Sequence, residues 1–103
     1  GLTVDDLYSI YNKDAAAADA EFKRQTLTVT GVVDKVTVND VHEIFYIILA
    51  GAEKKERWNV RCTFARQYAS NLKQLANGQR VAVQGAYDGY KLNILMKNCE
   101  ILS

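Results

Sequence analysis

The chain has 103 residues, of which 49% are hydrophobic, and its formal net charge is +1. This length fits one domain over residues 1–103, and the apolar content excludes an intrinsically disordered chain. A net charge so close to zero excludes the strong global field of a highly basic nucleic-acid-binding protein. The charge is uneven, since residues 1–22 carry −4 and residues 23–103 carry +5. We therefore expect an acidic N-terminal arm on a mildly basic body.

The first segment has the spacing of an amphipathic helix. Apolar side chains recur at the i, i+3, i+4 and i+7 positions of one helix face: Val4, Leu7, Tyr8 and Tyr11. Thr3 is a good start signal, and Asn12 or Asp14 is placed to cap a second short helix. The pattern predicts helix over about residues 4–22, either kinked or split near residues 12–14.

Two strands are predicted to follow, joined by a turn at Asn39 and Asp40. The first runs from Thr26 to Val38, with Leu27 and Val29 inside and a bulge or sharp bend at Gly31. The second runs over residues 41–49 and is apolar on both faces. Its alternation sends one set of side chains to the core (Phe45, Ile47 and Leu49) and another outward (Ile44, Tyr46 and Ile48). Residues 53–56 are charged and predict a hairpin loop.

The second half alternates strand, helix and two further strands. Residues 57–64 predict a third strand with four inner side chains: Trp58, Val60, Cys62 and Phe64. A helix is predicted over residues 65–76, ended by Asn77 and Gly78, and a fourth strand over residues 79–85. Residues 85–90 contain Asp88-Gly89, a strong hairpin signal, and predict a turn. The fifth strand covers residues 91–102, with a bulge near residues 97–98 before Cys99.

Three strands, a helix and two strands form the element order of an OB-fold, a five-stranded Greek-key barrel. The predicted architecture is thus mainly β. It consists of a barrel over about residues 25–102, a helix between its third and fourth strands, and an N-terminal helical extension.

Several segments resemble the tRNA-anti-like group of OB-fold proteins. They are Ala18-Asp19, Phe22-Lys23, the run from Thr26 to Val33, the run from Val60 to Phe64, the run from Leu75 to Gly85, and the run from Leu95 to Ile101. The resemblance covers about residues 18–103 and consists of core and turn positions. It implies a small bacterial protein of the periplasm or outer envelope, often exported or lipid-anchored, and grouped as nucleic-acid-binding by fold analogy. It supplies no catalytic residues.

OB-folds bind ligands across the outer face of the second and third strands, bordered by the loops after strands one and four. Single-stranded nucleic acid would need aromatic platforms and cations there. The candidate residues are Tyr46, Arg61, Asn59, Tyr87, Tyr90, Lys35 and Lys91. The same apolar stripe around Tyr46 could instead be covered by the N-terminal helix, by a protein partner or by a second copy of the chain. A small ligand or a glycan is a further alternative.

Cys62 and Cys99 fall on strands that are neighbours in an OB barrel. They could form a disulfide, or each could be a small buried hydrophobic residue. His42, the only histidine, lies in a turn beside two acids and makes a poor metal site. Trp58 is expected in the core. No cofactor or metal is expected, and no arrangement of residues predicts an enzyme. Membrane association is expected only through a lipid anchor outside this sequence.

Overall fold

The computed structural model describes residues 1–53 and 57–102, in which five strands build a barrel and short helices pack against it. The strands are β2 (Thr26–Asn39), β3 (Ile44–Ala50), β4 (Val60–Thr63), β5 (Arg80–Tyr90) and β6 (Ile94–Ile101). Their order is β2-β3-β4-β6-β5, and β2 also pairs with β5, so the sheet closes into a barrel. β4 and β6 run parallel, whereas the other barrel pairs are antiparallel. This is the strand order of the predicted OB-fold.

The N-terminal arm consists of a short strand and two helices. β1 (Leu2–Thr3) pairs in parallel with β2 and was not predicted. α1 (Val4–Lys13) and α2 (Ala15–Phe22) confirm the helical arm and its split. The split occurs at Asp14, whose carboxylate accepts a hydrogen bond from the Ala17 N–H (3.0 Å) and so caps α2, as predicted.

The register irregularity in β2 lies at Asp34, so the bulge that was one alternative predicted at Gly31 is wrong. The register passes from Val33 opposite Leu49 to Lys35 opposite Ile48, which leaves Asp34 as the extra residue. The bulge changes which residues face inward, from odd numbers such as Val33 to even numbers such as Val36. Gly31 is instead a point of close approach, because a β-carbon there would lie 2.7 Å from Val4 Cγ2.

Several elements are shorter than predicted. The helix expected over residues 65–76 consists of η1 (Arg66–Tyr68) and α3 (Ala69–Lys73). After Lys73 the chain tightens, since Gln74 and Leu75 donate to carbonyls three residues back. β3 begins at Ile44 because residues 40–43 form a turn. β4 begins at Val60 because Trp58 has a positive φ of 62°.

β5 is longer than predicted, and this corrects the expected turn at residues 85–90. The strand continues to Tyr90, with Gly89 at a φ of 88°, and the turn lies at residues 91–93. In β6 the bulge before Cys99 is confirmed, because Gln84 faces Glu100 while Ala86 faces Lys97. The extra residue lies in the Asn98–Cys99 stretch, and Asn98 has a φ of 51°.

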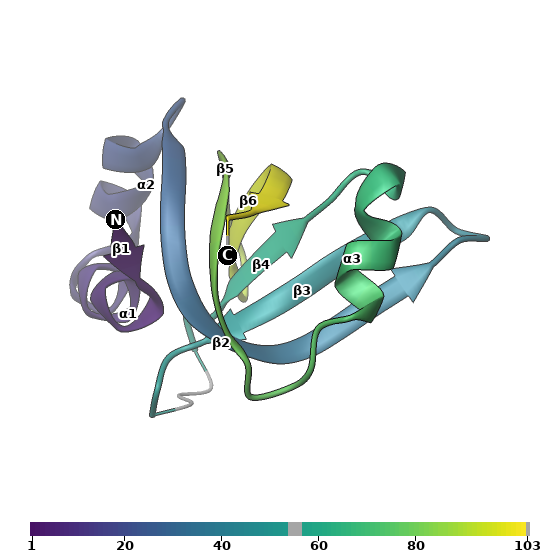
Figure 1. The fold of residues 1–103 in the computed structure, drawn as a ribbon. Coiled ribbons are helices and arrows are strands. Elements are labelled where there is room, and N and C mark those ends of the chain that lie inside the picture. Colours follow the sequence, from purple (N-terminus) through teal and green to yellow (C-terminus); the bar gives the residue numbers. More distant parts are fainter. Residues whose placement is uncertain (54–56, 103) are drawn as a thin grey trace.

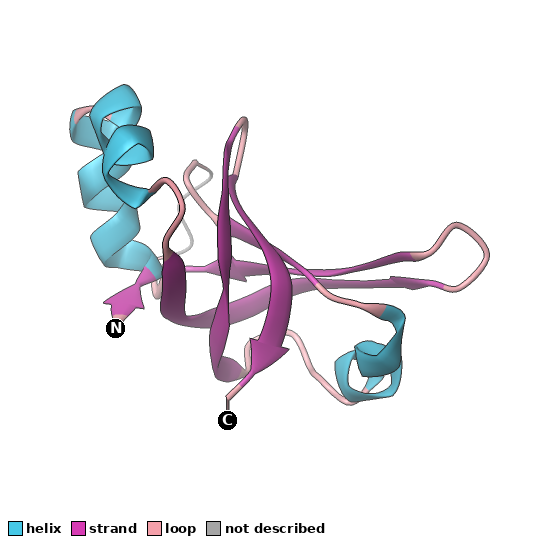
Figure 2. Cartoon of the chain, turned by 90° about the horizontal axis from the view of Figure 1, so that it is seen from above, coloured by secondary structure: helices cyan, strands magenta, loops and turns pink. Residues whose placement is uncertain are grey.

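The helices lie at opposite ends of the barrel (Figures 1 and 2). At one end α1 packs against β2 and β3 and α2 packs against β5, while α3 lies across β2 and β3 near the other end. The predicted inner side chains of the second and third strands are all buried, as are Leu27 and Val29. No helix in the described ranges is long and apolar enough to cross a membrane. The charged loop predicted for residues 53–56 falls, apart from Glu53, outside the described residues.

Candidate nucleic-acid interface

Three of the predicted site residues meet on the outer face of β2, β3 and β4. The pairing sets Lys35, Ile48 and Arg61 in one row across the three strands. The next row places Thr37, Tyr46 and Thr63 side by side. The Arg61 guanidinium lies 4.0 Å from the centre of the Tyr46 ring, and Lys35 Nζ lies 5.9 Å from it. Tyr46 is thus flanked by two cations, and we call Lys35, Tyr46 and Arg61 the cationic platform.

The cationic platform favours negative charge. A hydrogen bond from the Thr37 hydroxyl lowers the pKa of Tyr46, and Lys35 and Arg61 act in the same direction. Within residues 1–53 and 57–102, neither Lys35 nor Arg61 forms an ion pair with a carboxylate. Two cations that form no ion pair with a carboxylate of these residues, placed beside an aromatic ring, suit a phosphate-bearing ligand.

A groove of about 460 Å³ adjoins the cationic platform and includes Arg61 in its lining. It crosses β4 and β6 and ends at the β5–β6 turn, where Lys91 stands at its edge. Its lining residues are Arg61, Thr63, Asp88, Lys91, Leu92, Asn93, Leu95 and Met96. Arg61 therefore belongs to both the cationic platform and this groove, which we call the β4–β6 groove. Lys91 joins the predicted site through the groove.

Tyr87 and Tyr90 do not join the cationic platform, and their predicted place in a loop is wrong. Tyr87 lies inside β5 with only 7% of its surface exposed. Its hydroxyl accepts a hydrogen bond from Tyr11 (2.8 Å) and donates one to Asp19 (2.6 Å). Burial, followed by the bond to Asp19, raises the pKa of Tyr87. Because its ring is buried and its hydroxyl is engaged, Tyr87 offers no stacking surface.

Tyr90 lies at the end of β5 that faces the helical arm. Its ring packs against Tyr11, with centroids 5.7 Å apart, and against Trp58, at 5.8 Å. Its remaining surface lines a second groove, of about 450 Å³, beside Lys23 and Arg24. Trp58 is buried, as predicted. Asn59 precedes β4, where its carbonyl accepts the Ile94 N–H (2.9 Å).

The apolar stripe of Ile44, Tyr46 and Ile48 remains open to solvent in this chain. Ile44 is 39% exposed, and Tyr46 and Ile48 are partly exposed. The N-terminal helices bury their apolar side chains at the other end of the barrel, so the alternative in which they cover the stripe is wrong (Figures 1 and 2). The stripe is therefore available to a ligand or a partner.

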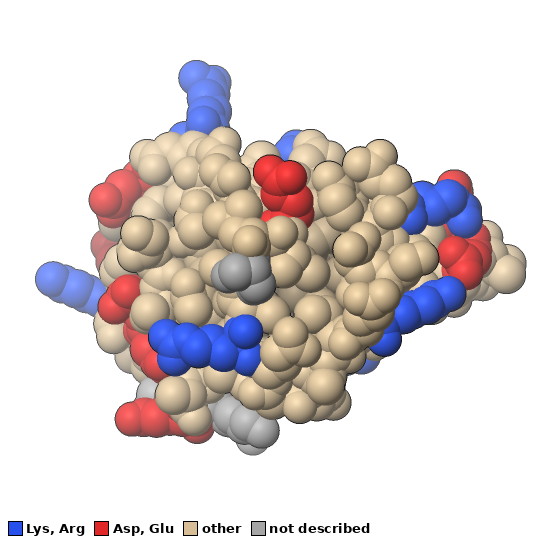
Figure 3. Space-filling view, in the orientation of Figure 1, with Lys and Arg blue, Asp and Glu red and all other residues tan. Residues whose placement is uncertain are grey.

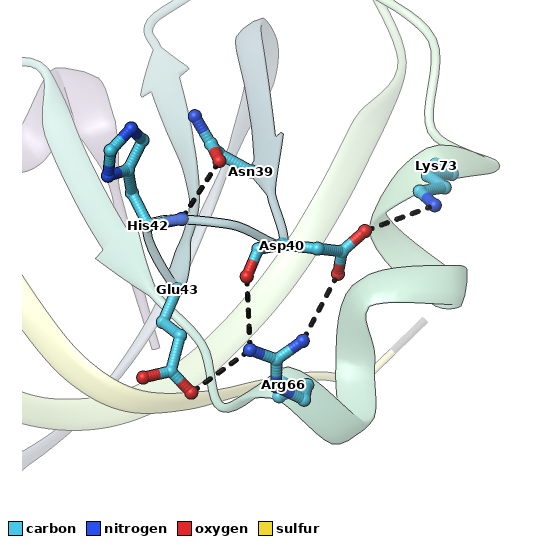
Figure 4. A network of polar contacts seen from close by, with 6 residues as sticks. All are labelled: Asn39, Asp40, His42, Glu43, Arg66 and Lys73. Carbon is cyan, nitrogen blue, oxygen red and sulfur yellow. Dashed lines mark hydrogen bonds and ion pairs between the residues drawn. The ribbon is translucent and has the colours of Figure 1, made fainter.

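The β2–β3 turn, which borders this face, is held by Arg66 (Figure 4). Its guanidinium donates to the Asp40 carbonyl (3.1 Å) and to the Glu43 carboxylate (3.0 Å), and Lys73 lies 4.0 Å from the Asp40 carboxylate. The His42 imidazole points away from both carboxylates (Figure 4). No group of three or more side chains that could hold a metal occurs in the described part of the chain.

The two cysteines are both buried and carry free thiols, so the structure contains no Cys62–Cys99 disulfide. The thiols are neighbours inside the barrel, and Gly85 makes room for Cys99, since a β-carbon on Gly85 would lie 2.5 Å from its sulfur. Hydrogen bonding to Cys99, together with burial, raises the pKa of the Cys62 thiol well above its usual value. Both cysteines act here as the small buried residues that were the alternative prediction.

The face seen in Figure 3 carries both basic and acidic side chains. On the face seen in Figure 3, single basic and acidic side chains are separated by neutral surface, and both signs meet near the β2–β3 turn. No basic stripe crosses that face. The cationic platform is thus a local feature, in keeping with a net charge of +1.

The sequence reading missed Thr37, Asp88 and Arg66. Thr37 lies beside Tyr46 because of the bulge at Asp34, and no sequence pattern predicted that bulge. Asp88 was assigned to a turn because Asp-Gly is a hairpin signal, yet it lies in β5 and lines the β4–β6 groove. Arg66 lies far in sequence from the turn that it holds.

The tRNA_anti-like family model matches residues 1–100 of this chain. The chain belongs to the tRNA_anti-like family. This is an OB-fold family related to nucleic-acid-binding domains rather than a catalytic family. No curated protein sequence matches the chain.

Solved structures similar to this family member share its fold at low sequence identity. A "putative nucleic acid-binding lipoprotein" from Klebsiella pneumoniae is 13% identical, with a TM-score of 0.82 over 100% of this chain and 92% of that one. The asparaginyl-tRNA synthetase from Pyrococcus horikoshii is 12% identical, with a TM-score of 0.56 over 81% of this chain but 20% of its own. The Stn1–Ten1 complex of S. pombe is also 12% identical, with a TM-score of 0.54 over 75% of this chain and 57% of that one.

Proposed function

We propose that this protein is a non-catalytic module of the bacterial cell envelope that binds single-stranded nucleic acid with residues 1–103 acting as one domain. The strand crosses β2, β3 and β4, with its phosphates on Lys35 and Arg61 and its far end at Lys91. The observation that carries the proposal is the cationic platform on the face that OB-folds use for ligands. There Tyr46 is flanked by two cations that have no ion-pair partner among residues 1–53 and 57–102.

The comparisons support the class of ligand and the location. The family is grouped with nucleic-acid-binding OB-folds, and the Klebsiella structure, which matches over the whole chain, is of a protein named as a lipoprotein. We infer from that neighbour that a lipid anchor, outside the sequence given, holds the domain at the membrane. Fractionation of cells expressing the full protein should then place it with the envelope.

The test is fluorescence anisotropy of labelled single-stranded DNA and RNA at low and at physiological salt. Wild-type protein should bind, and the affinity should fall as salt rises, because phosphate contacts release counterions. The double variant Lys35→Ala, Arg61→Ala should bind more weakly, and its logarithmic salt slope should fall by about 1.4, since each single-strand phosphate contact contributes about 0.7.

The matched control is Arg80→Ala, which removes one exposed cation from β5, away from the cationic platform. It should leave the salt slope close to that of the wild type. Because Arg80→Ala removes one cation and the double variant removes two, a fall in the salt slope of Arg80→Ala by about 0.7, half that of the double variant, would show that only net charge matters. That result would overturn the assignment of the platform. No binding by the wild type, even at low salt, would overturn the proposed function and favour the alternative, a protein-interaction module that uses the same open face.

A further inference from the structure

The β4–β6 groove combines features that a phosphate site alone does not need. Leu92, Leu95 and Met96 give it apolar walls, while Arg61 and Lys91 place cations along it. Its volume of about 460 Å³ lies within the range of small-molecule sites, about 300–1,000 Å³. A groove with apolar walls beside a phosphate-binding platform suits the base of a nucleotide better than the phosphate.

Asp88 is the carboxylate in this groove. A carboxylate repels the phosphates of a bound strand, so its presence weakens a site that only attracts anions. Asp88 is held by Lys97, at 3.5 Å, and 48% of its side chain is exposed. An ionised carboxylate only accepts hydrogen bonds and has room for about four. One cation leaves acceptor positions free, and these can be filled by a ligand that carries N–H donors.

We propose that the β4–β6 groove holds one unstacked guanine of the bound strand and that Asp88 selects it. This inference rests on the function proposed above. Guanine presents two neighbouring donors, N1–H and the exocyclic amino group, to the two oxygens of the carboxylate. Thymine and uracil present one N–H between two carbonyl oxygens, which the carboxylate repels. Arg61 and Lys91, which both line the groove, contact the flanking phosphates.

The experiment compares the affinity of the protein for three 11-nucleotide DNA strands by anisotropy at one salt concentration. The strands are all thymine, thymine with one central guanine, and thymine with one central hypoxanthine. Hypoxanthine keeps N1–H but lacks the amino group. The guanine strand should bind about tenfold more tightly than the thymine strand, in line with discrimination by one bidentate pair. The hypoxanthine strand should fall between them.

The decisive variant is Asp88→Asn, which keeps the shape and removes the carboxylate. It should lose the preference for guanine while binding the all-thymine strand at least as well as the wild type, because a negative charge has gone. Glu21→Gln, which removes one acid from α2, is the charge-matched control and should keep the preference. Thermal melting checks that both variants fold.

The outcomes separate this inference from the function on which it rests. Equal affinity of wild-type protein for guanine and thymine strands, or a preference that survives in Asp88→Asn, would overturn the guanine site and leave strand binding intact. Failure of every strand to bind at low salt would overturn both.

Discussion

The stacking of Arg61 on Tyr46 changes what the candidate site offers at the level of single residues. From the sequence, Tyr46 is the aromatic platform and Arg61 is a phosphate contact. In the structure the guanidinium lies 4.0 Å from the ring centre and covers one face of the ring. A guanidinium held flat by an aromatic ring can itself carry a stacked base on its outer plane while its N–H groups bind phosphate. In the proposed site, Arg61 is therefore placed both to stack a base and to contact phosphate.

Tyr87, in contrast to Arg61, stabilises the fold through its hydroxyl. It joins the buried Tyr11 hydroxyl to Asp19, and so ties β5 to both helices of the arm. Tyr87→Phe should lower the free energy of unfolding by about 1–3 kcal/mol, because the Tyr11 O–H would be left buried without its partner. Tyr11→Phe should cost less, about 0.5–1.5 kcal/mol, since Tyr87 would keep Asp19. Urea unfolding measures both values.

Strand binding supplies the second readout for Tyr87→Phe. Oligonucleotide affinity should stay at the wild-type value, because Tyr87 lies away from the cationic platform. A lower oligonucleotide affinity with unchanged stability would show that Tyr87 takes part in binding.

At the level of the elements, alternation and capping were readable from the sequence, whereas interruptions were not. The inward positions of Leu27, Ile47 and Cys62 follow from period-two patterns that burial enforces. No such pattern marks the bulge at Asp34 or the left-handed backbone at Trp58. The strand that continues through Asp88 runs against the hairpin signal of Asp88-Gly89. Much of the site lies next to these interruptions. The barrel could therefore be predicted from the sequence, but only part of its binding face.

The N-terminal cap of α2 was predicted from the sequence. Asp14→Ala should lower the free energy of unfolding by about 1 kcal/mol, because the Ala17 N–H loses its acceptor. Asp14→Asn is the matched control, since asparagine caps helices about as well as aspartate. Urea unfolding followed by circular dichroism measures the loss. If Asp14→Asn costs as much as Asp14→Ala, the charge of Asp14 rather than its cap stabilises the arm.

At the scale of the whole molecule, the helical arm and the barrel share one core. Val4, Leu7 and Tyr11 of α1 are buried together with side chains of the strands, and Tyr11 lies against Trp58 with ring centroids 5.3 Å apart. The arm thus closes the end of the barrel away from α3, while the outer face of β2, β3 and β4 stays free. This division of surfaces lets the helices stabilise the barrel without blocking the face proposed to bind the strand.

Gly31 is a point of close contact between the arm and the barrel. A β-carbon there would lie 2.7 Å from Val4 Cγ2, 3.0 Å from the Ala50 carbonyl oxygen and 3.1 Å from Leu49 Cβ. Gly31→Ala should therefore push α1 from the barrel and lower the free energy of unfolding by about 1–3 kcal/mol, the usual cost of overpacking. Because Trp58 packs against Tyr11 of α1, its fluorescence should report the displacement.

A double-mutant cycle with Val4→Ala separates this clash from other effects of the added methyl group. Val4→Ala removes the atom that the new β-carbon meets first, so Gly31→Ala should cost less in that background than in the wild type. The remaining cost reflects the Ala50 carbonyl, which cannot withdraw without disturbing the β2–β3 pairing. If Gly31→Ala lowers the free energy of unfolding equally in both backgrounds, the added methyl group does not clash with Val4. α1 would then be attached to the barrel more loosely than its buried side chains indicate.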